Sequence, residues 1–425
     1  MFEHGREKPA AVGGLVVAAA MLMMALIPAI AHDPAPGRPG PSSGVSPLVG
    51  PPSTSVPVGS GPFGLAFDGV TGTIWVANFG TANVTVVNGT TNAIQRASIP
   101  AGVEPTSVTF DSGNGYVYVT NEGSSNVTVI DGATDHIVTS IAVGSAPFDG
   151  AYDSANGYVY VVNQDSGNVT MIDGTTNQVI GSGIPVGTDP TGITYDGVNG
   201  DLYVTNYATG NVSVISTVTN KVIVPSIPTG ANDEYSTLDP VNDSIFVSSR
   251  IGGNVTVIDG ATNAIAVHSI SVGPQPRGLA FDPFNGYVYV GIGGVTNVTA
   301  INGTTHQTVP PSIPAGFAPW ALEVEPSNGY VYVANRDGTN LTVFAPSYSI
   351  GSRPSGTSSS GASGISAGEA YAVFAVLAAW GAAGTAAAVY FRRVPRRPGP
   401  LQPSGSAPPS GPGAAPPSSP PSGAS

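Results

Sequence analysis

Residues 116–132 read Tyr-Val-Tyr-Val-Thr-Asn-Glu-Gly-Ser-Ser-Asn-Val-Thr-Val-Ile-Asp-Gly, and variants of this stretch recur along the chain. The Asn-Val-Thr triplet or a close variant begins at seven positions, namely Asn83, Asn126, Asn168, Asn211, Asn254, Asn297 and Asn340. Successive positions differ by 42 or 43 residues. Because a period of about 40–45 residues is typical of four-stranded propeller blades, the spacing predicts an all-β, seven-bladed β-propeller.

The second repeat shows how one blade is built. Apolar stretches at 105–111, 116–121, 126–132 and 137–144 are separated by breaks rich in Gly, Asn and Asp. This alternation predicts four antiparallel strands, A to D. Asn114-Gly115 between the first two is the usual signal of a two-residue type I′ hairpin.

The two ends of the repeat region predict how the ring closes. Val56-Pro-Val-Gly59 matches the end of a strand D but has no A, B or C strand before it. The last repeat has strands A, B and C at 320–325, 331–335 and 341–344, without a clear D. We therefore expect the N-terminal strand to complete the last blade, since closure removes free sheet edges.

The segments outside the repeats predict export and a membrane anchor. Residues 1–31 carry two basic residues and then an apolar run ending Ala-Ile-Ala, as in a signal peptide, with an uncleaved anchor as the alternative. The remaining expected segments are a Pro-rich linker at 32–53, the propeller at 54–348, a Ser/Gly-rich linker at 349–369, a transmembrane helix at 370–391 and a disordered tail at 392–425.

The transmembrane prediction depends on length and flanking charge. Residues 370–391 are apolar and would span about 33 Å as a helix, enough for a bilayer core. Four arginines follow at once, namely Arg392, Arg393, Arg396 and Arg397. Because positive charge favours the cytoplasmic side, we expect a cell-membrane protein with extracellular repeats and a cytoplasmic tail.

Charge and composition exclude several function classes. Between residues 54 and 348 there are five basic and 22 acidic residues, which gives 5 − 22 = −17. A domain with this excess of negative charge is poorly suited to binding the phosphate backbone of nucleic acid. The chain has no cysteine, which excludes disulfides, thiolate metal sites and thiol nucleophiles.

Two stretches carry a resemblance to a known family. Val117-Tyr-Val-Thr-Asn121 and Leu202-Tyr-Val-Thr-Asn206, each followed by Asn-Val-Thr/Ser-Val-Ile, resemble the YVTN-repeat β-propeller family of archaeal surface-layer and bacterial periplasmic proteins. The resemblance covers all seven repeats and implies an extracytoplasmic binding or surface module. It implies no catalytic residue. Blade five departs most from the motif, with Ile245-Phe-Val-Ser-Ser249.

Positions that vary between repeats are candidates for ligand binding. The D-to-A position reads Phe63, Thr106, Phe148, Thr191, Glu234, Arg277 and Trp320, and the B-to-C position reads Phe79, Glu122, Gln164, Tyr207, Arg250, Gly293 and Arg336. In a propeller both positions surround the mouth of the central channel. The candidate binding residues are Arg250, Arg277, Arg336, Trp320, Glu234 and Tyr235.

This residue combination suits an anionic or glycan-like ligand, because guanidinium groups pair with carboxylates and aromatic faces stack on sugar rings. The alternative is a set of solvated loop residues paired with nearby acids such as Asp337. Replacing both Arg277 and Arg336 with Ala is expected to abolish ligand binding without unfolding the domain.

Two other repeated patterns have a structural and a functional interpretation. The seven Asn-x-Thr/Ser triplets are glycosylation sequons, joined by Asn88, Asn242 and Asn302, yet Asn and Thr also suit a turn and a strand. Acidic residues end strand A in all seven repeats, at Asp68, Asp111, Asp153, Asp196, Asp239, Asp282 and Glu325. We interpret these acids as turn caps and predict no metal site.

The predicted function is a membrane-anchored surface module for binding, adhesion or surface-layer architecture, which could also contact a neighbouring envelope protein. The alternative is an extracellular propeller enzyme of lyase or hydrolase type acting on a small or glycan substrate. His136 and His306 are expected in C-to-D connections and His268 in strand D, away from the loop face. We expect no cofactor and no catalytic residue.

Overall fold

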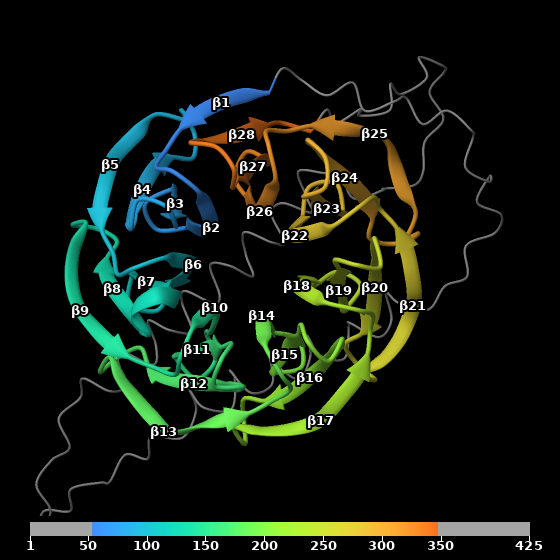
Figure 1. Cartoon of the computed structure of the whole chain (residues 1–425), viewed down its shortest axis with the longest axis horizontal. Helices are drawn as coiled ribbons and strands as arrows, with labels where there is room; N and C mark the ends of the chain where they lie inside the picture. The colour runs from blue at the N-terminus through green and yellow to red at the C-terminus, as the bar shows by residue number, and fades with distance from the viewer. Residues whose placement is uncertain (1–52, 347–425) are drawn as a thin grey trace, which may run out of the picture. The chain divides into compact units, whose positions relative to one another are not determined.

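The computed structural model describes residues 53–346; the predicted signal peptide, transmembrane helix and tail lie outside these residues. The described residues form seven four-stranded antiparallel sheets arranged in a ring (Figure 1). The prediction of an all-β, seven-bladed propeller is therefore confirmed. Within residues 53–346, no helix has the length and apolarity that a membrane span requires.

Each blade runs from an inner strand A to an outer strand D. The A strands are β2 (Pro62–Asp68), β6 (Pro105–Asp111), β10 (Pro147–Asp153), β14 (Pro190–Asp196), β18 (Asp233–Asp239), β22 (Pro276–Asp282) and β26 (Pro319–Glu325). The B strands are β3 (Thr73–Asn78), β7 (Tyr116–Asn121), β11 (Tyr158–Asn163), β15 (Asp201–Asn206), β19 (Ser244–Ser249), β23 (Tyr287–Ile292) and β27 (Tyr330–Asn335).

The outer half of each blade follows the same order. The C strands are β4 (Asn83–Asn88), β8 (Asn126–Asp131), β12 (Asn168–Asp173), β16 (Asn211–Ser216), β20 (Asn254–Asp259), β24 (Asn297–Asn302) and β28 (Asn340–Phe344). The D strands are β5 (Ile94–Pro100), β9 (His136–Ala142), β13 (Gln178–Pro185), β17 (Lys221–Pro228), β21 (Ala264–Ser271), β25 (Thr308–Pro314) and β1 (Thr54–Pro57). One short 3-10 helix, η1 (Glu122–Ser124), joins β7 to β8.

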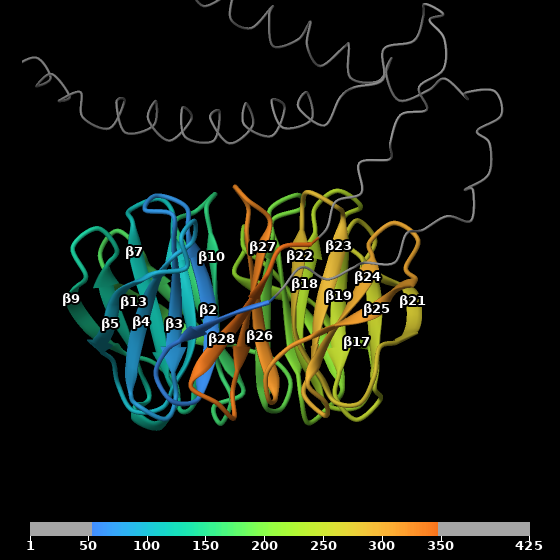
Figure 2. The ribbon, with the colours of Figure 1, turned by 90° about the horizontal axis from the view of Figure 1, so that it is seen from above.

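The ring closes as the sequence predicts. Strand β1 pairs antiparallel with β28, with Val56 opposite Leu341, so the N-terminal strand completes the last blade. Figure 2 shows β1 crossing beside β28 at this joint. Val56 is buried together with Leu65 of the first blade and Tyr332 of the last. The closing strand therefore completes a hydrophobic core shared by the first and the last blade.

The hydrophobic core lies between blades. Each buried cluster combines residues of two neighbouring sheets, for example Trp75 of blade one with Val117 of blade two. Strands β3 and β7 are buried almost throughout, whereas the outer strand β9 is mostly exposed. Because one blade cannot bury its faces alone, the repeats depend on their neighbours for stability.

The A-to-B turn differs from the expected hairpin. Asp111 pairs with Tyr116, which leaves four residues in the loop, and the Gly115 amide donates to the Asp111 carbonyl at 2.8 Å. Gly115 has φ of 79°, but Asn114 is not among the residues with positive φ. A type I′ turn needs positive φ at both central residues, so that prediction is wrong. The Asp111 side chain accepts the Gly113 amide at 2.8 Å and so stabilises the longer turn.

Candidate functional site

A pocket of about 310 Å³ opens where the D-to-A and B-to-C positions meet. Twelve of the fourteen aligned positions line it: Phe63, Phe79, Glu122, Phe148, Gln164, Thr191, Tyr207, Glu234, Arg250, Arg277, Trp320 and Arg336. The two that do not are Thr106 and Gly293. The D-to-A positions lie at the start of strand A and not in the preceding loop: Phe63 is the second residue of β2, and Trp320 is the second residue of β26. We call this cavity the mouth pocket.

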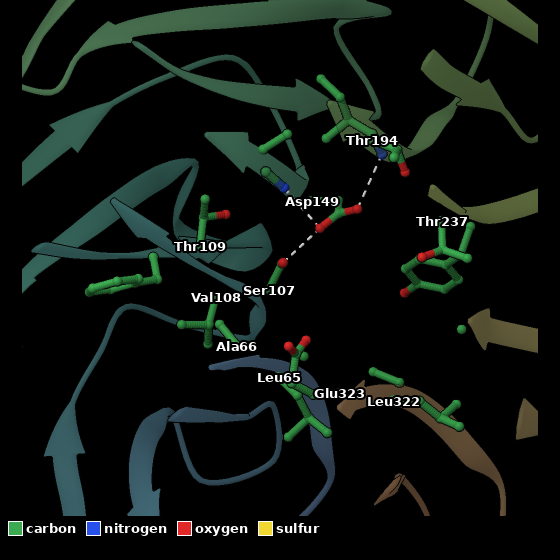
Figure 3. Close-up of a pocket in the computed structure, with 18 of the residues that line it drawn as sticks. Leu65, Ala66, Ser107, Val108, Thr109, Asp149, Thr194, Thr237, Leu322 and Glu323 are labelled. Carbon is green, nitrogen blue, oxygen red and sulfur yellow. Dashed lines mark hydrogen bonds between the residues drawn. The ribbon is translucent and has the colours of Figure 1, made fainter. Parts of the chain in front are cut away.

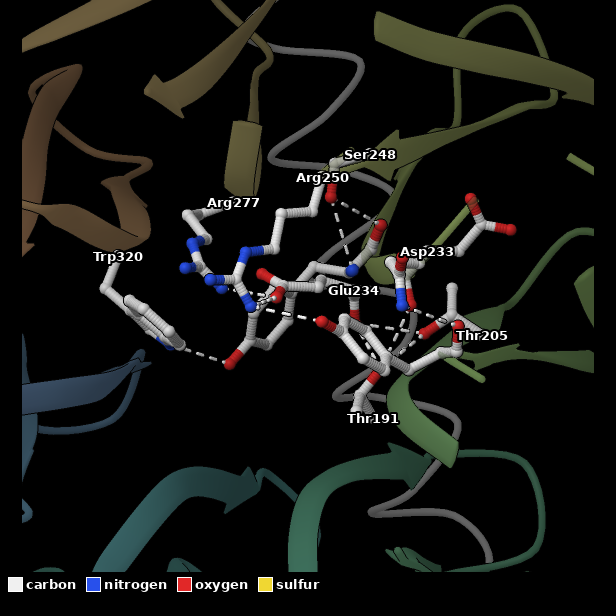
Figure 4. Close-up of polar contacts among 11 residues, drawn as sticks. Thr191, Thr205, Asp233, Glu234, Ser248, Arg250, Arg277 and Trp320 are labelled. Atoms are coloured by element: carbon white, nitrogen blue, oxygen red, sulfur yellow. Dashed lines mark hydrogen bonds and ion pairs between the residues drawn. The ribbon is translucent and has the colours of Figure 1, made fainter. Parts of the chain in front are cut away.

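A buried ion pair forms the centre of the mouth pocket. Arg277 and Glu234 are each only 5% exposed, and Nη1 of Arg277 donates to Oε1 of Glu234. Nη1 of Arg250 lies 3.5 Å from the same oxygen (Figure 4). Arg250 also donates to the Tyr207 hydroxyl at 3.1 Å. One carboxylate thus holds two arginines from neighbouring blades.

Desolvation acts against both members of this ion pair. Burial raises the pKa of Glu234, and the charge of Arg277 offsets only part of that rise. Burial likewise lowers the pKa of Arg277, against the opposing effect of Glu234. Oε2 of Glu234 and Nε of Arg277 are buried without a hydrogen-bond partner. The pair therefore holds two charges in place at an energetic cost, as is common for buried ion pairs.

Trp320 links the ion pair to the remaining arginine. The guanidinium carbon of Arg277 lies 3.8 Å from the Trp320 ring centroid, and that of Arg336 lies 4.3 Å from it. Nε1 of Trp320 donates to the Tyr235 hydroxyl at 2.9 Å. These contacts are cation–π interactions, which strengthen as the site loses water. The structure thus brings all six predicted residues into one connected cluster.

Arg336 differs from the other two arginines in having no carboxylate partner. Across residues 53–346, the ion pairs are Arg96–Asp135, Arg250–Glu234 and Arg277–Glu234. The alternative that Asp337 neutralises Arg336 is therefore not what the structure shows. Arg336 packs instead on Trp320 and, at 5.4 Å, on the Phe63 ring. Its guanidinium forms no ion pair within residues 53–346, although its charge acts at longer range to lower the pKa of Glu122 and Glu234.

An aromatic cluster borders Arg336. The Phe63 ring centroid lies 4.8 Å from Trp320, 5.6 Å from Phe148 and 5.7 Å from Phe79. Phe148 in turn lies 6.3 Å from Tyr235. The mouth pocket therefore combines an apolar aromatic wall with a cluster of arginines.

Gly293 explains why Arg277 can reach this position. A Cβ atom at Gly293 would lie 3.0 Å from both Cγ and Nε of Arg277. A side chain at this B-to-C position would be in tight contact with Arg277, which would have to shift slightly to make room for it. The glycine at this position of blade six therefore leaves the space that the Arg277 side chain of the same blade occupies.

A second cavity of about 620 Å³ lies along the inner strands, and we call it the channel. Sequence analysis missed the two acids that line it, Asp149 and Glu323. The alignment holds a signal for Glu323, because the other blades carry only Ala or Thr at that register: Ala66, Thr109, Ala151, Thr194, Thr237 and Ala280.

The Asn-x-Thr repeats have a structural role. Nδ2 of Asn121 donates to Oδ1 of Asn126 at 2.9 Å and to Oγ1 of Thr128 at 3.0 Å. Asn163 makes the same two contacts with Asn168 and Thr170, both at 2.8 Å. Where the YVTN-like motif ends in Asn, that side chain thus donates to both ends of the following triplet; blades five and six carry Ser249 and Ile292 at this position instead. Glycosylation of these sites stays a prediction.

The acids that end strand A cap their turns. Asp68, for example, is 1% exposed, and its Oδ1 accepts the Val70 and Thr71 amides at 2.8 and 3.1 Å. Within residues 53–346, no group of three or more His, Cys, Asp or Glu side chains is arranged to hold a metal ion. His306 lies between β24 and β25 as expected, but His136 is the first residue of strand β9 and not part of a connection.

Comparisons with known proteins identify the fold but no family. No family model matches the chain. No curated protein matches it by sequence. Among solved structures, hydrazine synthase from Kuenenia stuttgartiensis matches with a TM-score of 0.60 and 19% identity over 72% of this chain and 98% of that one. The Cps50 (Swd1) β-propeller domain of Myceliophteria thermophila matches with a TM-score of 0.59 and 10% identity, over 69% of this chain and 100% of that domain. Streptogramin B lyase matches with a TM-score of 0.59 and 13% identity, over 69% of this chain and 97% of the lyase. At these identities the chain is similar to them in fold alone.

Proposed function

We propose that this protein is a membrane-anchored, extracellular binding module whose mouth pocket takes an anionic ligand with a planar or apolar part. The observation that carries the proposal is Arg336, which packs against the Trp320 ring and has no carboxylate partner within residues 53–346. A carboxylate or sulfate group would supply the missing hydrogen-bond acceptor. The aromatic wall around Phe63 would hold the ligand's apolar part.

The charge distribution supports this choice of ligand. Three of the five basic residues between 54 and 348 line the mouth pocket, whereas only two of its 22 acids, Glu122 and Glu234, do so. The pocket is thus a local positive site (3 − 2 = +1) on a domain of net charge −17. Such a local field favours anions over the other solutes that reach the mouth.

The placement at the cell surface is part of the proposal. It rests on the apolar segment 370–391 and the four arginines that follow it, as derived above. The YVTN-like motifs support grouping the chain with the YVTN-repeat propellers, whose members include surface-layer proteins. Adhesion to acidic envelope polymers would suit both the location and the site. An extracellular enzyme remains the alternative.

The test is binding of the full 425-residue chain to an array of acidic glycans and envelope fragments, comparing wild type with Arg336→Gln. Because a hydrogen bond to a charged group contributes about 1.5–3 kcal/mol, we expect a loss of affinity of roughly 10- to 100-fold. Arg96→Gln is the matched control, since it removes the same charge from an outer strand. Equal binding by wild type and Arg336→Gln would refute the site.

A further inference from the structure

The channel is chemically distinct from the mouth pocket. Its wall is made by the inner strands and includes Thr109, Asp149, Thr194, Thr237 and Glu323 (Figure 3). Among the residues that the structure describes, no lysine, arginine or histidine lines it. The titratable groups that face it are Asp149, Glu323 and the tyrosines Tyr152, Tyr195 and Tyr235. The cavity therefore carries carboxyl groups without a compensating basic side chain.

Asp149 is fully engaged with the protein. Its Oδ1 accepts the Ser107 hydroxyl at 2.7 Å and the Gly150 amide at 2.8 Å. Its Oδ2 accepts the Ile193 amide at 3.2 Å. These hydrogen bonds hold the Asp149 carboxylate against the channel wall, and each of its two oxygens has at least one donor from the protein.

Glu323 has no such partners. No hydrogen bond or ion pair joins its carboxyl group to another side chain or to the backbone of residues 53–346, and its oxygens are not among the buried unpartnered atoms. The side chain is partly accessible, but the space it faces is the channel. Desolvation within the protein raises the pKa of Glu323 to about 8. A carboxyl group so placed lacks the counter-ion or donor that would stabilise its charge.

We infer that the channel binds a cationic group, the primary ammonium of an organic amine, with Glu323 as its counter-ion. An ammonium group has three N–H donors, and the channel offers the Glu323 carboxylate together with the hydroxyl-bearing residues Thr109 and Thr237. A chelated Ca²⁺ ion fits less well, since it takes six to eight oxygen ligands and three protein groups already donate hydrogen bonds to the Asp149 carboxylate. The volume of about 620 Å³ leaves room for the carbon chain of the amine.

This site is independent of the proposed anion site. Arg336 lines the mouth pocket and Glu323 lines the channel, and neither residue lines the other cavity. The two cavities share the Phe63 residue, so both open along the same inner wall. Loss of one binding activity can therefore be measured in a variant that keeps the other.

The test uses the full-length chain and n-propylammonium, with tetramethylammonium as the matched cation that lacks N–H donors. Titration calorimetry at pH 6, 7, 8 and 9 would measure both affinities. Binding of n-propylammonium should strengthen about tenfold per pH unit up to pH 8 and then level off, as the Glu323 carboxyl ionises. Tetramethylammonium should bind at least tenfold more weakly at pH 9. Equal binding of the two cations, or an affinity independent of pH, would overturn the inference.

Two variants complete the test. Glu323→Gln keeps the side-chain shape and should lower the n-propylammonium affinity at pH 9 by at least tenfold. Asp165→Asn removes a carboxylate from an exposed loop and should change it less than twofold. Arg336→Gln should also leave it unchanged, so failure of the anion site would not imitate failure of this one. Retained binding by Glu323→Gln, or Ca²⁺ binding in place of the amine, would contradict the assignment.

Discussion

The hydroxyl of Tyr332 donates a 2.6 Å hydrogen bond to Oδ1 of Asn92, which lies 240 positions away in the sequence. Tyr332 is fully buried in strand β27 of the last blade, and Asn92 lies in the turn between β4 and β5 of the first. The same contact joins Tyr118 to Asn177 at 2.7 Å, between blades two and three. The closing joint of the ring thus uses the same tyrosine contact as an internal joint.

Tyr332→Phe should lower the free energy of unfolding by about 0.5–1.5 kcal/mol, because it removes the hydroxyl that donates to the half-buried Asn92 side chain and one of the two side-chain donors to the buried Gly89 carbonyl. Denaturant unfolding of wild type and variant would measure the loss. Tyr118→Phe removes the equivalent donor from an internal joint and should cost a similar amount. A cost at Tyr118 but none at Tyr332 would show that the closing joint does not depend on this bond.

Thr128→Val should destabilise the domain by about 1 kcal/mol, since it removes the acceptor that Asn121 Nδ2 uses at 3.0 Å. Thr128→Ser keeps both the hydroxyl and the Asn126 sequon and should be close to neutral. Thermal unfolding of unglycosylated protein separates the two explanations of the repeat. If the Val and Ser variants of unglycosylated protein unfolded at the same temperature, selection for glycosylation would explain the triplet better than hydrogen bonding.

Arg277→Ala should destabilise the protein strongly, by about 3–5 kcal/mol, because it leaves the Glu234 carboxylate buried with only the longer contact to Arg250. Simultaneous Glu234→Gln should recover much of this loss. The recovery is best measured as a double-mutant cycle in urea. Additive effects of the two changes would contradict a direct pairing. Arg277 is thus a poor choice for testing ligand binding, in contrast to the half-buried Arg336, which forms no ion pair within residues 53–346.

Glu323→Gln should make the protein more stable than wild type as the pH rises. The folded-state pKa of Glu323, about 8, lies above its usual 4.5, so the folded protein keeps a proton that the unfolded chain releases between these values. Wild-type stability should then fall across this window by up to about 1.4 kcal/mol per pH unit, and the variant lacks this contribution. Unfolding titrations from pH 4 to pH 9 would show the two curves diverging. Parallel curves would mean that the Glu323 pKa is unperturbed.

The repeat pattern allowed a close prediction of the strands. The predicted strands A and B of the second repeat, 105–111 and 116–121, coincide with β6 and β7. The prediction succeeded because each strand is bounded by turn residues at a constant spacing. It failed at the A-to-B turn, where the Asp111 carboxylate stabilises a longer loop than the Asn-Gly signal implies.

The mouth pocket was predictable for a related reason. A propeller places equivalent residues of every repeat at equivalent points of the ring, so aligned variable positions converge on one opening. Alignment could not show which residues pair. Arg277 contacts the Glu234 carboxylate of the neighbouring blade, whereas Arg336 packs on the Trp320 ring. This difference depends on which groups each side chain can reach in the folded ring.

By itself, the sequence determined the number of blades, the closing strand and the position of the mouth, because these follow from local periodicity repeated seven times. Only the tertiary structure decided which charges are compensated. Glu234 and Glu323 are both glutamates of inner strands, yet Glu234 contacts two arginines, whereas Glu323 faces the channel without a partner in the described part of the chain. That difference arises from contacts between blades, and a linear repeat does not specify the distances on which those contacts depend.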